Sequence, residues 1–179
     1  MKVKTYNIIL GVAVTVVSAA VWPASVRAAQ DKYTLKAPNG VAGSEFLGYE
    51  SWENVAPSAT EDGIKSILAN PLMINAYKEG IPGNGKPFPD GSMVVKIEWK
   101  KKTNTVSPYF VEVPDTLKSV AFIQKDNKRF PDSSGWGFAQ FNYDAASRTF
   151  KPFGKDALFN QVCYKCHTRV KERDYIFTA

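Results

Sequence analysis

The sequence is poor in residues that bind metals or form disulfides. Its 179 residues include one histidine and two cysteines. A structural zinc site needs four ligands, and these three residues leave the tetrahedron incomplete. The chain also lacks internal repeats and low-complexity tracts. A zinc module and a repeat architecture are therefore both disfavoured.

Charge of one sign is only in moderate excess. The formal net charge is +6, and three of the cations, Lys2, Lys4 and Arg27, lie close to the N-terminus. The one basic cluster, 100–102, suits a solvated strand end, with docking onto an acidic redox partner protein as the alternative. We expect no nucleic-acid partner.

The N-terminus has the pattern of a secretory signal. Lys2 and Lys4 precede an apolar run over 8–22, and small residues follow at 26–28. The run is shorter than the roughly 20 residues of a spanning helix, which disfavours a retained membrane anchor. We predict cleavage after Ala28, a single domain over 29–179, and a periplasmic location in a Gram-negative source.

The motif Cys163-Tyr164-Lys165-Cys166-His167 stands near the C-terminus. C-x-x-C-H is the attachment signature of a c-type haem: each cysteine forms a thioether to a vinyl group, and the histidine ligates the iron. We predict one covalent haem c per chain. Because His167 is the only histidine, the opposite face of the iron is open or filled by another residue type.

Other uses of the cysteines fit less well. Thioredoxin-type chemistry places C-x-x-C early in a βαβ unit. A disulfide between Cys163 and Cys166 would be strained and would leave His167 without a role.

Two common haem proteins are also disfavoured. Small electron-transfer cytochromes carry the motif near the N-terminus and a methionine ligand after it, but no methionine follows His167. Met73 and Met93 suit core filling. Cytochromes c′ are four-helix bundles, which eleven prolines and alternating strands do not fit.

The residue pattern predicts an α+β fold, predominantly antiparallel sheet with a few short helices and a C-terminal haem-attachment helix. Met93 to Trp99 is the clearest strand, because apolar Val95 and Ile97 alternate with Lys96 and Glu98 on a polar face. Further strands are expected over 49–55 (ending at Pro57), 64–68, 117–124 and 136–143. Helices are expected over 72–79 and 156–163.

Several short motifs, in order, resemble cytochrome P-460 and its relatives, the cytochromes c′-beta. They are Tyr49-x-x-Trp52, Phe88-x-Asp90-Gly91, Val94 to Glu98, Lys125-Asp126, Arg129-Phe130, Gly135-Trp136-x-Phe138, the haem motif and Asp174-x-x-Phe177-Thr178. The resemblance covers about 49–178. Such relatives usually run on beyond this point, so a slightly shortened C-terminus is one alternative.

The resemblance implies an antiparallel sheet, a homodimer, and a five-coordinate haem with a proximal histidine. Some members oxidise hydroxylamine, and in these a strand lysine is linked to the porphyrin. The matching residue is Lys96, although its alternation with Glu98 is also typical of a solvated lysine. The cytochromes c′-beta lack the link and bind nitric oxide or carbon monoxide behind an aromatic cap.

Hydroxylamine oxidation also needs a proton acceptor, which is a distal carboxylate in active relatives. The candidates are Glu98, Asp126 and Asp156. Each is otherwise a surface carboxylate, Asp126 in an ion network and Asp156 as a helix N-cap.

Some larger side chains have two interpretations. Four could wall the distal pocket but are more typical of sheet core: Phe88, Phe122, Phe138 and Phe141. Trp52 and Trp136 suit core anchors, and Arg129 could pair with a haem propionate.

The expected function is redox chemistry on small nitrogen species. The alternatives are a non-catalytic binder of nitric oxide or carbon monoxide, and an electron carrier with Met73 or a lysine as sixth ligand.

Overall fold

The computed structural model describes residues 30–178 of the chain. The predicted signal segment, with its cleavage point after Ala28, lies outside this range and stays a prediction. Within 30–178, no helix has the length and apolar character needed to cross a membrane.

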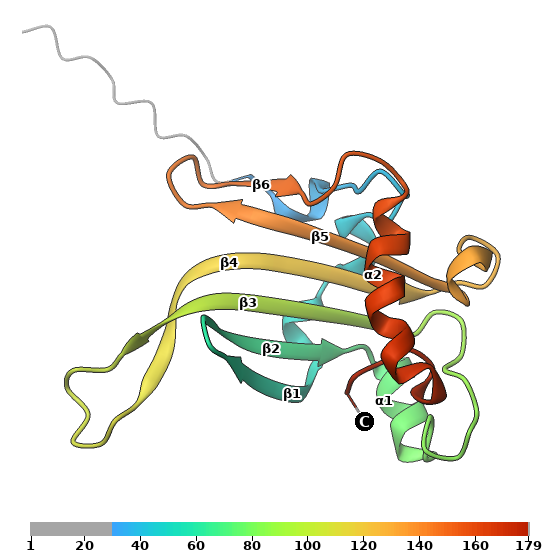
Figure 1. Ribbon diagram of the computed structural model, residues 1–179, viewed down its shortest axis with the longest axis horizontal. Helices are drawn as coiled ribbons and strands as arrows, with labels where there is room; N and C mark the ends of the chain where they lie inside the picture. The colour runs from blue at the N-terminus through green and yellow to red at the C-terminus, as the bar shows by residue number, and fades with distance from the viewer. Residues whose placement is uncertain (1–29, 179) are drawn as a thin grey trace, which may run out of the picture.

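Six strands form one antiparallel sheet, in which each strand pairs with the next in sequence (Figure 1). The strands are β1 (Glu53–Thr60), β2 (Gly63–Ala69), β3 (Met93–Thr103), β4 (Glu112–Lys125), β5 (Trp136–Asp144) and β6 (Thr149–Pro152). The helices are α1 (Pro71–Lys78) and α2 (Phe159–His167), with 3-10 turns η1 (Lys32–Thr34), η2 (Gly43–Phe46), η3 (Tyr49–Ser51), η4 (Pro131–Ser133) and η5 (Thr168–Arg173). The predicted α+β class is confirmed.

Helix α1 begins and ends where its flanking residues predict. The Asn70 side chain accepts the backbone N–H of Met73 at 3.1 Å, and Pro71 occupies the first turn. Gly80, at φ 84°, follows the last turn in a left-handed conformation that a side chain would disfavour.

The predicted first strand is wrong in its bounds. Tyr49–Ser51 is a 3-10 turn, and β1 continues through Pro57 to Thr60. Pro57 pairs with Ser66 of β2, and β1 is an edge strand of the six-stranded sheet that residues 30–178 form. Proline is tolerated there because an edge strand does not need every N–H for pairing.

Two elements near the C-terminus also differ from expectation. The helix predicted over 156–163 begins at Phe159 and continues to His167. Asp156 is not its N-cap: its carboxylate accepts the N–H of Leu158 at 2.9 Å, in the turn before the helix. Strand β6 is absent from the prediction, because four residues at a sheet edge carry little periodic signal.

Strands β3 and β4 extend beyond the rest of the sheet as a hairpin (Figure 1). The basic cluster lies here. Lys101 pairs with Glu112 and Lys102 with Asp115, both at 2.8 Å. The cluster is thus a partly paired strand end.

Each face of the sheet is covered by a different part of the chain. One core combines residues of the N-terminal turns with the sheet: Leu35, Val41, Phe46, Tyr49, Leu68, Val95, Val120, Phe122, Ala139 and Phe141. The other combines α1, the C-terminal segment and the opposite face: Met73, Ile74, Phe88, Val94, Ile123, Trp136, Phe138 and Ile176. All four candidate phenylalanines are therefore core residues, two on each face.

The face of β3 that carries Val94, Lys96 and Glu98 is not the solvated face that its alternation suggests. Val94 is buried, and Lys96 and Glu98 are partly buried. The C-terminal segment that covers this face lies far away in sequence, so local periodicity could not reveal it.

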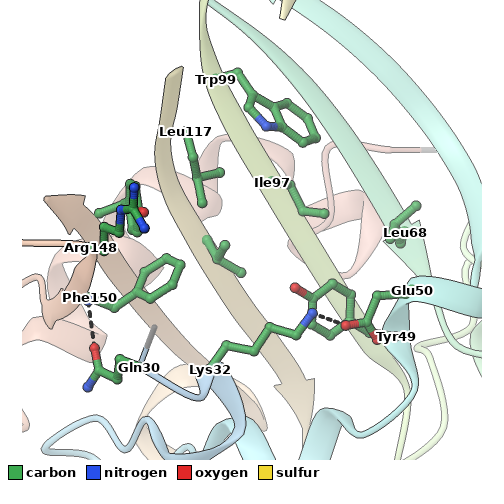
Figure 2. Close-up of a pocket in the computed structure, with 12 residues that line it drawn as sticks. Gln30, Lys32, Tyr49, Glu50, Leu68, Ile97, Trp99, Leu117, Arg148 and Phe150 are labelled. Carbon is green, nitrogen blue, oxygen red and sulfur yellow. Dashed lines mark hydrogen bonds and ion pairs between the residues drawn. The ribbon is translucent and has the colours of Figure 1, made fainter. Parts of the chain in front are cut away.

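A groove of about 580 Å³ opens on the opposite face (Figure 2). Ile97, Trp99 and Leu117 form its floor, and the ion pair of Lys32 with Glu50 stands at its edge. None of the predicted site residues lines this groove. The homodimer that the resemblance implies stays a prediction.

Candidate functional site

Helix α2 carries the haem motif and is anchored by a buried asparagine. The Asn160 carbonyl accepts the N–H of Phe138 at 2.7 Å, and its amide donates to the Ser133 hydroxyl at 2.7 Å. The single side chain of Asn160 thus links α2 to both β5 and η4. This residue was not among the sequence predictions, because a lone asparagine in an apolar segment gives no local signal.

We expect Asn160→Ala to lower the free energy of unfolding by about 1–3 kcal/mol, since the Phe138 N–H loses its partner in a buried site. Gln161→Ala is the matched control, because Gln161 is exposed and makes one 3.3 Å contact with Asp132. Its effect should stay within about 0.5 kcal/mol. Urea unfolding of both variants measures the difference, and equal stabilities would contradict the anchoring role.

The two motif cysteines are free thiols on one helix. Cys166 is exposed, whereas Cys163 packs against the core beneath α2. Burial raises the pKa of the Cys163 thiol to about 11. Zinc binds thiolates, so this environment disfavours a zinc ligand. Within 30–178, moreover, no three His, Cys, Asp or Glu side chains cluster in a way that could hold a metal ion.

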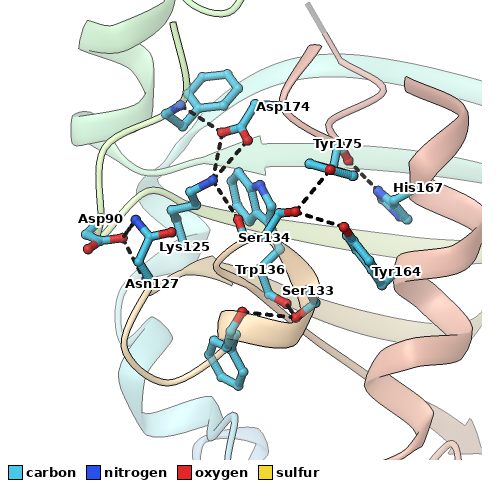
Figure 3. A network of polar contacts seen from close by, with 12 residues as sticks. Asp90, Lys125, Asn127, Ser133, Ser134, Trp136, Tyr164, His167, Asp174 and Tyr175 are labelled. Atoms are coloured by element: carbon cyan, nitrogen blue, oxygen red, sulfur yellow. Dashed lines mark hydrogen bonds and ion pairs between the residues drawn. The ribbon is translucent and has the colours of Figure 1, made fainter. Parts of the chain in front are cut away.

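His167 is held in one orientation (Figure 3). Its Nδ1 lies 2.6 Å from the backbone oxygen of Tyr175. A carbonyl only accepts, so Nδ1 carries the hydrogen and Nε2 keeps a free lone pair. The rings of Phe138 and Phe177 pack beside the imidazole, at 4.6 and 5.0 Å between centroids.

Burial favours the neutral form of His167. Desolvation lowers its pKa, and the hydrogen bond to Tyr175 only partly opposes this effect. The neutral imidazole is therefore favoured, as an axial ligand requires.

A cavity of about 350 Å³ lies beside the motif, and Lys96 lines it together with residues of the motif. Its lining residues come from four strands and the C-terminal segment: Ser58, Lys65, Ile67, Val94, Lys96, Ile123, Cys166, His167, Ile176, Phe177 and Thr178. Of the predicted site residues, the structure thus gathers Lys96, Cys166 and His167 around one space, and Cys163 lies in the core next to it.

The environment of Lys96 lowers the pKa of its amine. Burial lowers its pKa most strongly, and the positive charge of Lys65 lowers it further, whereas the charge of Glu98 acts in the opposite direction. A lysine that is partly desolvated beside an apolar cavity loses its proton more readily than a surface lysine.

The three candidate carboxylates do not line the cavity. Glu98 is the closest by position, two residues along β3 from Lys96, but its carboxylate pairs with Lys118 at 2.8 Å. Asp126 accepts the N–H groups of Lys128 and Arg129, each at 3.0 Å, in the loop after β4.

Asp156 lies in the exposed turn before α2. Arg129 is also occupied elsewhere, since it pairs with Glu45 at 2.6 Å and does not line the cavity.

Comparison with known proteins agrees with this geometry. A sequence model described as Cytochrome P460 matches residues 47–178. The chain belongs to the cytochrome P460 family. Haem is therefore the cofactor of this protein. No curated protein matches the chain.

The cavity fits the haem of a cytochrome P460 chemically. Five of its lining side chains are aliphatic or aromatic, and they lie beside the His167 imidazole and the free thiol of Cys166. Phe177 lines the cavity and is 49% exposed, so it offers apolar surface that a porphyrin could cover. The residues that would hold the haem are Cys163, Cys166 and His167.

Neither methionine after residue 28 lines this cavity. Met73 is fully buried among core residues, and Met93 packs against the core of the other face. Both act as core filling, as predicted.

Proposed function

We propose that this cytochrome P460 is an exported protein with one covalent c-type haem, and that it oxidises hydroxylamine or reacts with nitric oxide at a five-coordinate iron. The observation that carries the proposal is the position of Lys96. This lysine lines the same cavity as Cys166 and His167, where burial lowers the pKa of its amine.

The motif residues hold the haem in this proposal. The S–H bonds of Cys163 and Cys166 add across the two vinyl groups, which forms two thioethers with no net oxidation. His167 ligates through Nε2, because Nδ1 is engaged with Tyr175. The bound haem supplies one-electron redox chemistry and an open coordination position.

Lys96 supplies a nucleophile toward the porphyrin. Joining its nitrogen to a porphyrin carbon forms one N–C bond and removes one hydrogen from each atom. This loss of two electrons and two protons requires an oxidant, for which a peroxide reduced to water suffices. Burial of Lys96 favours the amine that the reaction needs.

Glu98 is the proton acceptor that the geometry favours. Conversion of hydroxylamine to nitric oxide releases three electrons and three protons, so a base near the cavity is required. Glu98 shares a face of β3 with Lys96 and is 14% exposed. Its carboxylate pairs with Lys118 at 2.8 Å. Asp126 and Asp156 lie in turns away from the cavity.

The released electrons need an acceptor outside the chain. We propose that the acceptor is a redox protein of the same compartment. In a Gram-negative cell this compartment is the periplasm, which the chain enters by way of a signal segment cleaved after Ala28.

A second candidate is a binder of nitric oxide or carbon monoxide. The observation in its favour is that, within residues 30–178, no carboxylate side chain lines the cavity. A site without a carboxylate can bind diatomic gases but lacks the distal proton acceptor that hydroxylamine oxidation needs.

Absorption spectra and hydroxylamine turnover test the proposal on protein matured in a host that attaches c-type haem. We expect a broad, red-shifted Soret band and reduction of an artificial electron acceptor that depends on hydroxylamine. An ordinary five-coordinate spectrum with nitric oxide binding but no turnover would favour the gas binder. A six-coordinate low-spin spectrum would indicate an electron carrier with a lysine ligand.

A further inference from the structure

The chain makes an unusual turn after η5, the 3-10 turn that follows α2. Asp174 and Tyr175 both have positive φ, at 48° and 65°. Side chains other than glycine disfavour the left-handed region, so two successive residues there require a restraint. The turn brings the Tyr175 carbonyl back to Nδ1 of His167.

A buried ion pair supplies one restraint. The ammonium of Lys125 contacts both carboxylate oxygens of Asp174, at 2.9 and 3.0 Å, and the two side chains are 4% and 10% exposed. The third donor of Lys125 goes to the Ser134 carbonyl at 2.9 Å. Asp174 also accepts the N–H of Phe88 at 2.8 Å. Asp174 is thereby fixed to β4 and to the segment before β3.

Ser134 restrains the neighbouring residue (Figure 3). Its hydroxyl donates to the Tyr175 hydroxyl at 3.0 Å and contacts the Tyr164 hydroxyl at 2.8 Å. Tyr164 belongs to the haem motif, and its ring packs on that of Tyr175. The loop between β4 and β5 therefore holds both sides of the turn against α2.

We propose that the Lys125–Asp174 pair is a positioning device for the axial histidine. It holds Asp174 and Tyr175 in the left-handed turn, and the turn holds the carbonyl that orients the His167 imidazole. A hydrogen bond at Nδ1 fixes the ring and raises the basicity of the ligating nitrogen. The inference rests on His167 being the iron ligand of the proposed function.

The test compares two double variants that differ only in their tolerance of positive φ. Lys125→Met/Asp174→Ala and Lys125→Met/Asp174→Gly both remove the ion pair and the acceptor of the Phe88 N–H. Glycine adopts the left-handed conformation readily, whereas alanine does not. The control is Lys101→Met/Glu112→Gln, which removes a partly exposed pair on the hairpin.

Resonance Raman spectra and redox titration of the haem-loaded proteins give the readout. In the alanine variant we expect the iron–histidine stretching band to move to lower frequency and broaden, and the reduction potential to rise, because the histidine becomes a weaker donor. The glycine variant and the control should both match the unaltered protein.

Two outcomes would overturn the inference: an unchanged band in the alanine variant, or equal shifts in the alanine and glycine variants, which would indicate a charge effect rather than the turn. If alanine prevents haem loading, the glycine variant decides, since a band displaced there is also contrary to the proposal. Absence of any iron–histidine band in the unaltered protein would instead refute the proposed function.

Discussion

A chain with alanine at both Cys163 and Cys166 should release its haem on denaturation, whereas the unaltered chain should keep it. The reason is that the two thioethers are the covalent bonds that a C-x-x-C-H motif forms. The comparison is best made in the Lys96→Ala background, where no lysine link can hold the porphyrin. In intact-mass spectra of the denatured proteins, the chain with both cysteines should carry the mass of one haem. The chain without them should have the mass of the polypeptide alone.

Single variants sharpen this prediction. Cys163→Ala and Cys166→Ala should each retain covalent haem with one vinyl group unreacted, which moves the alkaline pyridine spectrum to longer wavelength. The control is Lys165→Ala, an exposed position between the two cysteines. It should keep both thioethers. Haem that stays attached in the triple variant would show a covalent bond at another residue and would refute the attachment chemistry.

The chemistry of attachment is predictable from sequence because it is local. Cys163, Cys166 and His167 lie within one turn and a half of helix, so their spacing alone fixes their common side. Helix α1 is predictable from sequence for the same reason, since Asn70, Pro71 and Gly80 are capping signals within one short segment. No packing partner is needed to interpret either pattern.

Non-local contacts set the limit of such reasoning. Lys96 has the alternation of a solvated strand lysine, and only the fold shows that its face is shared with Cys166 and His167. Asp174 and Lys125 stand 49 positions apart in sequence. Both occur among the motifs that resemble the P460 family, but nothing in their spacing predicts that they pair.

Edge elements escaped prediction for a different reason. Pro57 is a strand breaker in general, but β1 lies at the sheet edge, where a missing N–H costs little. Strand β6 is short and lies at the other edge. At both edges, position in the sheet decides the outcome, and position is a property of the whole fold.

Replacement of Lys96 by alanine should remove the red shift of the Soret band and most of the hydroxylamine turnover. Without the amine no N–C bond can form, so the haem keeps the electronics of an ordinary c-type centre. We expect turnover to fall about a hundredfold, which corresponds to about 2.7 kcal/mol in activation free energy. Haem content should not change, since the thioethers remain.

Lys65→Ala is the matched control for this experiment. Lys65 lines the same cavity from the neighbouring strand β2, and its positive charge also acts on Lys96. Loss of charge alone would therefore affect both variants, whereas loss of the covalent bond affects only Lys96→Ala. Intact mass separates the two directly, because the unaltered chain should be lighter by two hydrogens than its sequence plus haem requires. Equal spectra and turnover in the unaltered and Lys96→Ala proteins would refute the link and leave Lys96 as a polar wall of the haem cavity.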